Sequence, residues 1–248
     1  MKVFGLIGFP LSHSFSQKYF AKKFVTEGIQ DTTYENFEIK HIDDLPALLE
    51  SYPDLFGLNV TIPYKEEVKK YIDDLDYSAR KVGAVNVIKV LPDRSLVGYN
   101  SDYYGFRTSL ESWLGGKTAS FNALVLGTGG ASKAVKVVLE DCNINYRTVS
   151  RDGKKGDFTY FELIEDPDIV RDHTLIINTT PLGMYPHVNE APQLPYDQLN
   201  DGYYLYDLIY NPEETLFLEK GKENGAIIKN GLEMLILQAE KSWEIWNQ

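Results

Sequence analysis

Two charged side chains, Lys65 and Asp102, stand where the sequence makes acid–base chemistry possible. Lys65 follows an apolar run in the segment LNVTIPYKEEV, and Pro63 just before it is typical of a helix start. A cation in the first turn of a helix is electrostatically unfavourable, because that end of the helix is itself positive. Such a lysine either points into solvent, which position alone favours, or exchanges a proton. Asp102, in GYNSDYYGF, could equally be an ordinary carboxylate at a helix start.

A glycine-rich turn, in the segment GTGGASKA, lies between an apolar strand and an amphipathic helix. Gly127, Gly129 and Gly130 permit a tight turn and let backbone N–H groups approach a pyrophosphate at the positive end of the helix. The usual third glycine of a dinucleotide-binding loop is replaced by Ser132. The pattern favours a bound dinucleotide, and a glycine turn without a ligand is the alternative.

The strand after this helix ends in Ser150 and Arg151, where a chain that binds NAD normally has a carboxylate for the ribose 2′-hydroxyl. Arginine matches a 2′-phosphate with paired donors, and Lys154 and Lys155 add positive charge nearby. Asp152 weakens this inference, and a solvated basic turn is the alternative. NADP is therefore the expected cofactor.

A polar loop, PLSHSFS, joins the first expected strand to the first expected helix. The hydroxyls of Ser12 and Ser14 and the backbone donors of this loop could hold a substrate carboxylate, although helix capping is the ordinary explanation. His13 has no obvious partner elsewhere in the sequence, so we assign it no role.

Alternating strands and helices must position these residues. In the first half of the chain, we expect helices from residue 16 to 28, 44–51 and 102–114, and strands at 2–9, 33–39, 55–61, 85–90 and 96–99. Gly115 and Gly116 close the last of these helices and mark a domain boundary. In the second half, we expect helices at 130–141 and 231–246, and strands at 121–126, 146–150, 174–178 and 203–207. Repeated βα units imply a parallel sheet with helices on both faces.

The composition limits the class of protein. A chain of 248 residues with 43% hydrophobic and 25% charged residues is typical of a folded protein with one or two domains. A net charge of −11 argues against a nucleic-acid partner. No apolar run approaches the roughly 20 residues of a membrane-spanning helix. The single Cys142 cannot form an intramolecular bridge, so the cytoplasm is the expected location. We expect neither a metal ion nor a membrane partner.

Eight segments, taken in order, resemble the shikimate dehydrogenase family, the NADP enzymes of aromatic amino-acid biosynthesis. They are PLSHSFS, NVTIPYK, GAVNV, GYNSD, GTGGASKA, NTTPLGM, DLIYNPEET and NGLEMLILQA, which span most of the chain. The resemblance implies an α/β fold of two domains. Residues 1–102 and the C-terminal helix 231–248 would form the substrate-binding domain, and residues 103–230 a Rossmann-like NADP-binding domain. The reaction would take place in the cleft between them.

The resemblance also implies the residues of the site. Lys65 and Asp102 would be the catalytic pair, with protonated Lys65 supplying a proton as 3-dehydroshikimate is reduced to shikimate. The implied substrate contacts are Ser12, Ser14, Thr61, Asn86, Tyr210 and Gln238. The implied cofactor contacts are Gly127, Gly129, Gly130, Ala131, Ser150, Arg151, Lys154, Met184 and Gly231.

Two features depart from the family pattern. The family usually reads Asn-Arg-Thr after the second cofactor strand, with another arginine soon after, whereas this chain reads Ser150-Arg151-Asp152 followed by glycines and lysines. The contacts that bind the adenosine phosphate are therefore expected to differ from those of the family. The stretch 151–172 is also short for a full helix with its connections, so one element of the cofactor domain is expected to be abbreviated or missing.

Three other functions compete with this interpretation. A quinate or quinate/shikimate dehydrogenase, using NAD or NADP, would keep the same catalytic pair. A catalytically silent dinucleotide-binding regulator would need no proton donor, so Lys65 and Asp102 argue against it. A folate-type methylene dehydrogenase fits the S-x-S loop and the GYNSD segment poorly. The sequence does not distinguish a monomer from a homodimer.

Overall fold

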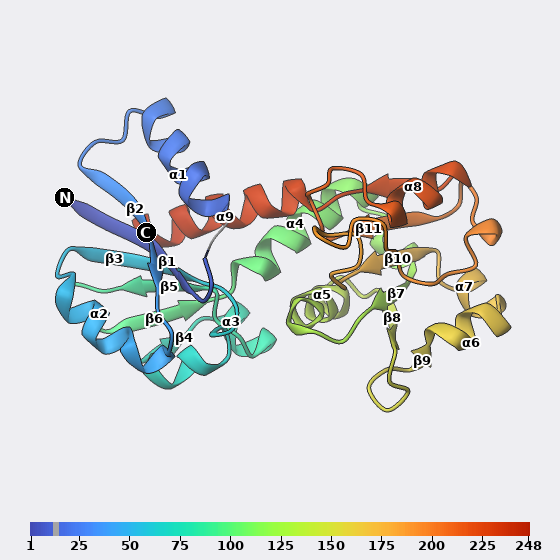
Figure 1. Ribbon diagram of the computed structural model, residues 1–248, viewed down its shortest axis with the longest axis horizontal. Helices are drawn as coiled ribbons and strands as arrows, with labels where there is room; N and C mark the ends of the chain where they lie inside the picture. Colours follow the sequence, from blue (N-terminus) through green and yellow to red (C-terminus); the bar gives the residue numbers. More distant parts are fainter. Residues whose placement is uncertain (12–14) are drawn as a thin grey trace. The chain divides into compact units, whose positions relative to one another are not determined.

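The computed structural model describes residues 1–11 and 15–248 and divides the chain into two compact units (Figure 1). Unit 1 comprises Met1–Tyr104 and Leu237–Gln248, and unit 2 comprises Gly105–Ile236. These boundaries lie a few residues from the expected ones at 102 and 231. The difference arises because helices α4 (Ser101–Leu114) and α9 (Leu232–Asn247) continue across the unit boundaries, so that no loop marks them.

Unit 1 contains a six-stranded mixed sheet with the order β2-β1-β3-β5-β6-β4. The strands are β1 Lys2–Gly8, β2 Thr32–Glu38, β3 Leu55–Val60, β4 Asp74–Leu75, β5 Val87–Val90 and β6 Leu96–Tyr99. β1 is parallel to β2 and β3, and β4 is parallel to β6, whereas β5 is antiparallel to both of its neighbours. The helices are α1 Phe15–Thr26, η1 Ile42–Asp44, α2 Leu45–Ser51, η2 Glu67–Tyr71 and α3 Tyr77–Val82.

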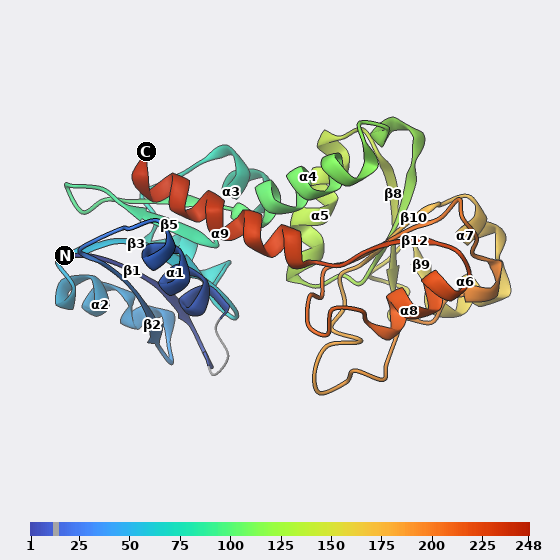
Figure 2. The same cartoon turned by 90° about the horizontal axis from the view of Figure 1, so that it is seen from above.

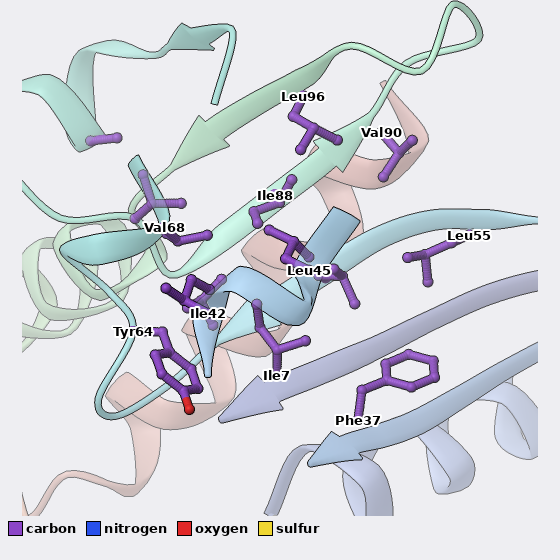
Figure 3. Close-up of a cluster of buried hydrophobic side chains, with 14 of the residues drawn as sticks. Ile7, Phe37, Ile42, Leu45, Leu55, Tyr64, Val68, Ile88, Val90 and Leu96 are labelled. Carbon is purple, nitrogen blue, oxygen red and sulfur yellow. The ribbon is translucent and has the colours of Figure 1, made fainter. Parts of the chain in front are cut away.

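Apolar side chains cover both faces of this sheet, because alternate residues of each strand point to opposite sides. One face packs Ile7 and Ile88 against Leu45 of α2 (Figure 3). On the opposite face, aromatic side chains of the strands, α1 and α9 form a cluster: Phe4, Phe20, Phe24, Tyr34 and Trp246. A side chain at Gly57 would collide with the indole of Trp246, so glycine there permits the C-terminal helix to dock.

The segment around Lys65 differs from the expectation. Residues 62–66 form a turn, and the helix that follows is the short 3₁₀ helix η2, so Lys65 does not occupy the first turn of an α-helix. The physical reason is a tertiary hydrogen bond: the carbonyl of Lys65 accepts from the backbone N–H of Val85 at 2.7 Å, instead of from the residue four positions ahead. Our prediction that Lys65 lies in the first turn of a helix, where a cation is unfavourable, is therefore wrong.

Unit 2 contains a six-stranded parallel sheet with the order β12-β11-β10-β7-β8-β9. The strands are β7 Asn122–Leu126, β8 Asn145–Ser150, β9 Phe158–Thr159, β10 Leu175–Asn178, β11 Tyr204–Asp207 and β12 Ile227–Lys229. The helices are η3 Thr118–Ser120, α5 Gly130–Asp141, α6 Tyr160–Glu165, α7 Asp168–Arg171, η4 Tyr196–Gln198 and α8 Leu216–Glu223. Figure 2 shows this sheet between α5 on one side and α6, α7 and α8 on the other. The expected parallel sheet with helices on both faces is confirmed.

The connection between β8 and β10 is abbreviated, as expected. It holds the two-residue strand β9 and two helices of six and four residues, α6 and α7. A capping box at Thr159 and Glu162 starts α6. Among the residues that the structure describes, no helix has the length and apolar character needed to cross a bilayer.

Candidate active site and cofactor cavity

Lys65 and Asp102, 37 positions apart in the sequence, form an ion pair in unit 1 with 2.6 Å between Nζ and Oδ2. The side chain of Lys65 is 32% exposed and that of Asp102 15% exposed. The carboxylate therefore fixes the position of an ammonium group that solvent and small molecules can still reach. Such a pair can hold a proton at Lys65 Nζ and deliver it to a bound substrate.

The position of Asp102 is set by Asn100, which begins helix α4. The Asn100 side chain accepts a hydrogen bond from the backbone N–H of Tyr103 at 3.1 Å and donates one to the carbonyl of Ala84 at 2.9 Å. Its backbone N–H donates to Ser78 Oγ at 2.9 Å. The start of α4 is therefore tied to helix α3 and to Ala84 just after it, which holds Asp102 opposite Lys65.

Asn86 lies beside this pair through its contacts with Ser101. Its Oδ1 accepts from the backbone N–H of Ser101 at 2.6 Å, and its Nδ2 donates to Ser101 Oγ at 3.1 Å. An amide nitrogen carries two hydrogens, and the bond to Ser101 Oγ uses one of them. Thr61 directly follows β3, and its backbone N–H donates to the carbonyl of Ile7 at 2.9 Å. The structure thus bonds Asn86 to the residue before Asp102, and Thr61 comes four residues before Lys65 in the sequence.

The other residues expected to contact the substrate lie on α9, in unit 2 or outside the described residues. Gln238 is half-buried on α9 in unit 1, and its carbonyl accepts from Ser242 Oγ at 2.9 Å. Tyr210 belongs to unit 2 and is 36% exposed. Ser12 and Ser14 lie outside the described residues.

A cavity of about 690 Å³ opens in unit 2 where β7, β8 and β10 end. The carboxyl ends of strands are the usual ligand-binding edge of an open parallel sheet. Four expected cofactor residues line the cavity: Gly127, Gly129, Ser150 and Arg151. Its other lining residues are Thr128, Asp152, Lys155, Tyr160, Thr179, Thr180, Pro181 and Leu182.

The glycine turn fits a dinucleotide pyrophosphate. Gly127 has φ of +103°, a conformation that favours glycine, and a Cβ there would meet Thr180 Cγ2 at 2.9 Å. Side chains at Gly129 or Gly130 would meet no atom within 4 Å, so the space before the 12-residue helix α5 is open. Ser132, where the third glycine was expected, is buried and its Oγ donates to the carbonyl of Gly129 at 2.7 Å. The serine therefore stabilises the turn rather than blocking it.

The basic end of the cavity is formed by Arg151 and Lys155, whereas Lys154, the expected contact, is not among the lining residues. The backbone N–H of Lys154 donates to Asp152 Oδ1 at 3.0 Å. This carboxylate therefore closes the turn, and Asp152 also lines the cavity. Tyr160, from the start of α6, also lines the cavity, and burial raises the pKa of its hydroxyl to about 12.

Several expected cofactor residues lie away from the cavity lining. Gly130 and Ala131 begin α5 behind the glycine turn, and Met184 is 47% exposed. Gly231 is packed against the backbone of Leu208, and its N–H donates to the carbonyl of Ile209 at 3.0 Å. The sequence analysis missed Thr179 and Thr180. The sequence feature that indicates them is a pair of hydroxyl residues directly after a buried strand.

Known proteins are similar to this chain in sequence. The chain is similar to a protein of Clostridium beijerinckii named shikimate dehydrogenase (NADP(+)), with 42% identity over 257 residues, 100% of this chain and 93% of the relative. The chain belongs to the shikimate dehydrogenase family. A family model described as the shikimate dehydrogenase substrate binding domain matches residues 6–88. The family membership expected from the eight segments is confirmed.

Solved structures of the shikimate dehydrogenase family have the same fold. A chorismate mutase/shikimate 5-dehydrogenase fusion protein from Clostridium acetobutylicum matches with a TM-score of 0.86 and 37% identity, covering 100% of this chain and 91% of that one. Shikimate 5-dehydrogenase of Thermus thermophilus, in complex with NADP(H) and shikimate, matches with a TM-score of 0.84 and 28% identity, covering 99% and 93%. The expected two-domain α/β architecture is confirmed.

Lys154 and Lys155 are expected to differ in their effect on NADPH binding. Lys155→Ala should weaken NADPH binding about fivefold, because it removes a partly solvated cation from the cavity. Lys154→Ala is the matched control and should change the affinity less than twofold. Titration of nicotinamide fluorescence measures both dissociation constants, and equal losses in the two variants would contradict the assignment.

A buried carboxylate in the cofactor-binding half of this family member makes stability depend on pH. Burial raises the pKa of Asp207 to about 6, above the value of about 3.9 for an exposed aspartate. Because the folded protein binds this proton more tightly than the unfolded chain, the stability contributed by Asp207 is greatest below about pH 4 and falls as pH rises toward 6.

Asp207→Asn removes this titration. Relative to the unaltered protein, the variant should gain as much as roughly 3 kcal/mol in free energy of unfolding between about pH 4 and pH 7. Urea denaturation of both proteins at several pH values measures the difference. A difference that stays constant over this range would show that Asp207 does not titrate as described.

Proposed function

We propose that this chain is an NADP-dependent shikimate dehydrogenase that reversibly reduces 3-dehydroshikimate to shikimate in aromatic amino-acid biosynthesis. The observation that carries the proposal is the ion pair of Lys65 and Asp102, with 2.6 Å between Nζ and Oδ2, in a chain that aligns over its full length with a relative named for this activity. The ammonium group supplies a proton donor, which reduction of a ketone requires.

Lys65 acts as the acid in the direction of reduction. Negative charge develops on the ketone oxygen as its carbon becomes an alcohol carbon, and the protonated Nζ of Lys65 delivers the proton that neutralises it. In the oxidation of shikimate, the neutral amine accepts the hydroxyl proton. Asp102 orients the amine, and because a carboxylate has two oxygen atoms, it can also accept a hydrogen bond from the neighbouring ring hydroxyl.

Five of the six substrate contacts in this proposal come from unit 1, and Tyr210 comes from unit 2. Thr61, Asn86 and Gln238 bind ring hydroxyls, and Ser12, Ser14 and Tyr210 bind the carboxylate. The proposal for Asn86 is supported by the hydrogen bonds that fix its amide group beside Ser101, the residue before Asp102. Unit 2 binds the cofactor through the glycine turn and the cavity beside it.

The cofactor is NADP in this proposal, and when bound it supplies the hydride to the ketone carbon. The open space in front of Gly129 and Gly130 accommodates the pyrophosphate at the N-terminus of α5. Arg151 and Lys155 hold the 2′-phosphate, because a guanidinium group binds phosphate oxygens with paired donors.

A spectrophotometric assay tests the proposal. Purified protein is incubated with shikimate, quinate or a methylene-folate substrate and with NADP⁺ or NAD⁺ in all combinations, and reduced nicotinamide is followed by its absorbance. We expect turnover with shikimate and NADP⁺. Equal turnover of quinate would favour a quinate/shikimate dehydrogenase, and NADPH binding without turnover would favour a silent regulator. Turnover only of a methylene-folate substrate would refute the proposal.

The cytoplasmic location and the assembly state are also proposals. The single cysteine of the chain supports a reducing compartment. Either a monomer or a homodimer fits the proposed chemistry, since both proposed catalytic residues come from one chain. Light scattering during size-exclusion chromatography determines which is present.

A further inference from the structure

A buried carboxylate, Asp207, connects two loops at the carboxyl edge of the sheet in unit 2. Asp207 is the last residue of β11 and has no exposed surface. Its Oδ1 accepts from the backbone N–H of Ile209 at 3.0 Å and from Asn178 Nδ2 at 3.1 Å, and its Oδ2 accepts from Thr215 Oγ1 at 2.6 Å. All three donors are neutral, so hydrogen bonds rather than an ion pair stabilise this carboxylate.

Asn178, the last residue of β10, carries this connection to the wall of the cofactor cavity. Its Oδ1 accepts from the backbone N–H of Thr180 at 3.0 Å and from Thr180 Oγ1 at 2.7 Å. Its Nδ2, besides donating to Asp207, donates to the carbonyl of Leu182 at 3.4 Å. Thr180 and Leu182 both line the cavity. One buried amide group therefore holds the cavity wall at two points.

The chemistry of Asp207 decides which way this amide group faces. An asparagine side chain can present either its oxygen or its nitrogen to a neighbour, but a carboxylate only accepts hydrogen bonds. Asp207 therefore requires Asn178 to turn Nδ2 toward it. The amide oxygen then faces Thr180, whose backbone N–H and hydroxyl both need an acceptor.

The same carboxylate also fixes the loop after β11. The backbone N–H of Ile209 donates to Asp207, and the carbonyl of Ile209 accepts from the N–H of Gly231 at 3.0 Å. The backbone N–H of Leu208 donates to the carbonyl of Asn178 at 3.1 Å. The two loops are thus joined by both side-chain and backbone hydrogen bonds around one buried acceptor.

We infer that Asp207 is a positioning residue for the cofactor: through Asn178 it sets the cavity wall from Thr180 to Leu182 in the geometry that binds the dinucleotide. The inference rests on the proposed function, because it takes the cavity as the NADP site. Asp207 lies beneath the wall rather than among the lining residues and acts through hydrogen bonds alone.

Asp207→Ala, Asp207→Asn and the control Asp197→Ala test this role. Asp197 is an exposed aspartate of η4 in the same unit. Fluorescence titration gives the NADPH dissociation constant, thermal unfolding gives the folded fraction, and steady-state kinetics give KM and kcat. We expect Asp207→Ala to weaken NADPH binding at least about tenfold. Its kcat at saturating NADPH should stay within about threefold of the parent, because Lys65 and Asp102 belong to unit 1.

Asp207→Asn should keep NADPH affinity within about threefold, since its amide oxygen still accepts from Ile209 and Asn178 while its nitrogen donates to Thr215 Oγ1. This rescue by the conservative variant distinguishes positioning from a requirement for negative charge. An Asp207→Asn variant as weak as Asp207→Ala, or a folded Asp207→Ala variant with parental affinity, would overturn the inference.

If Asp207→Ala does not fold, the next link in the chain of hydrogen bonds tests the same idea. Thr180→Val removes the hydroxyl that donates to Asn178 and should weaken NADPH binding about fivefold, whereas Thr180→Ser should retain it. Parental affinity in Thr180→Val would overturn the inference. A parent protein that binds no NADPH would refute the proposed function and the inference together. If the parent and a folded Asp207→Ala variant both bind NADPH normally, only the inference is refuted.

Discussion

Lys65→Ala is expected to lower kcat for shikimate oxidation by at least about a hundredfold, because it removes the group that accepts the hydroxyl proton. Proton transfer by a positioned side chain typically contributes about 10²- to 10⁴-fold in rate. NADPH affinity should stay nearly unchanged, since the glycine turn and cavity belong to unit 2 and Lys65 to unit 1. Steady-state kinetics and a separate NADPH titration measure the two effects.

Lys69→Ala provides the matched control for this variant. Lys69 follows Lys65 by four residues and lies in the short helix η2, whereas the ion pair with Asp102 is formed by Lys65. Its replacement should leave kcat within about twofold of the parent. If Lys65→Ala turned over shikimate at the parental rate, the proton would have another source and the assignment of Lys65 would fail.

Arg151→Ala is expected to raise the KM for NADPH by about 10- to 100-fold while changing the KM for NADH less than about threefold. Arg151 lines the cavity, and a hydrogen bond to a charged group contributes roughly 1.5–3 kcal/mol. NADH lacks the 2′-phosphate, so it loses little when Arg151 is removed. The ratio of kcat/KM for the two cofactors, measured on one preparation, gives the change in selectivity.

Arg147→Ala is the control for the loss of a positive charge from the same strand. Arg147 is exposed on β8 and pairs with Asp157 at 3.4 Å, and it is not among the cavity-lining residues. Its replacement should leave the cofactor selectivity of the protein unchanged. An equal loss of NADPH affinity in both variants would indicate a general effect of net charge rather than a phosphate contact.

The longer elements could be predicted from the sequence because their apolar residues follow a regular period. The strands β1, β3 and β7 and the helices α4, α5 and α9 all appear close to their expected residues. Several short elements were missed, among them β4, β9, α3, α7 and α8, whereas the four-residue strands β5, β6, β10 and β11 were predicted. So short a segment shows no clear period, and neighbouring segments decide its conformation.

The turn at Lys65 shows how a tertiary contact overrides a local signal. Pro63 and the charged residues after it favour a helix start, yet the carbonyl of Lys65 accepts a hydrogen bond from the backbone of Val85 at 2.7 Å. Val85 is close only because β3 and β5 are neighbours in the sheet. No property of the local sequence contains this information.

The sequence by itself determined the α/β class, the glycine turn and the family, because these depend on residue type, period and order along the chain. It also supplied Lys65 and Asp102 as candidates, although each alone had an ordinary explanation. Only the tertiary structure decided that they form an ion pair, that Lys155 rather than Lys154 lines the cavity, and that Asp207 bonds with Asn178. These contacts join residues from different strands, helices and turns, so they depend on distances through space that the order of residues along the chain does not specify.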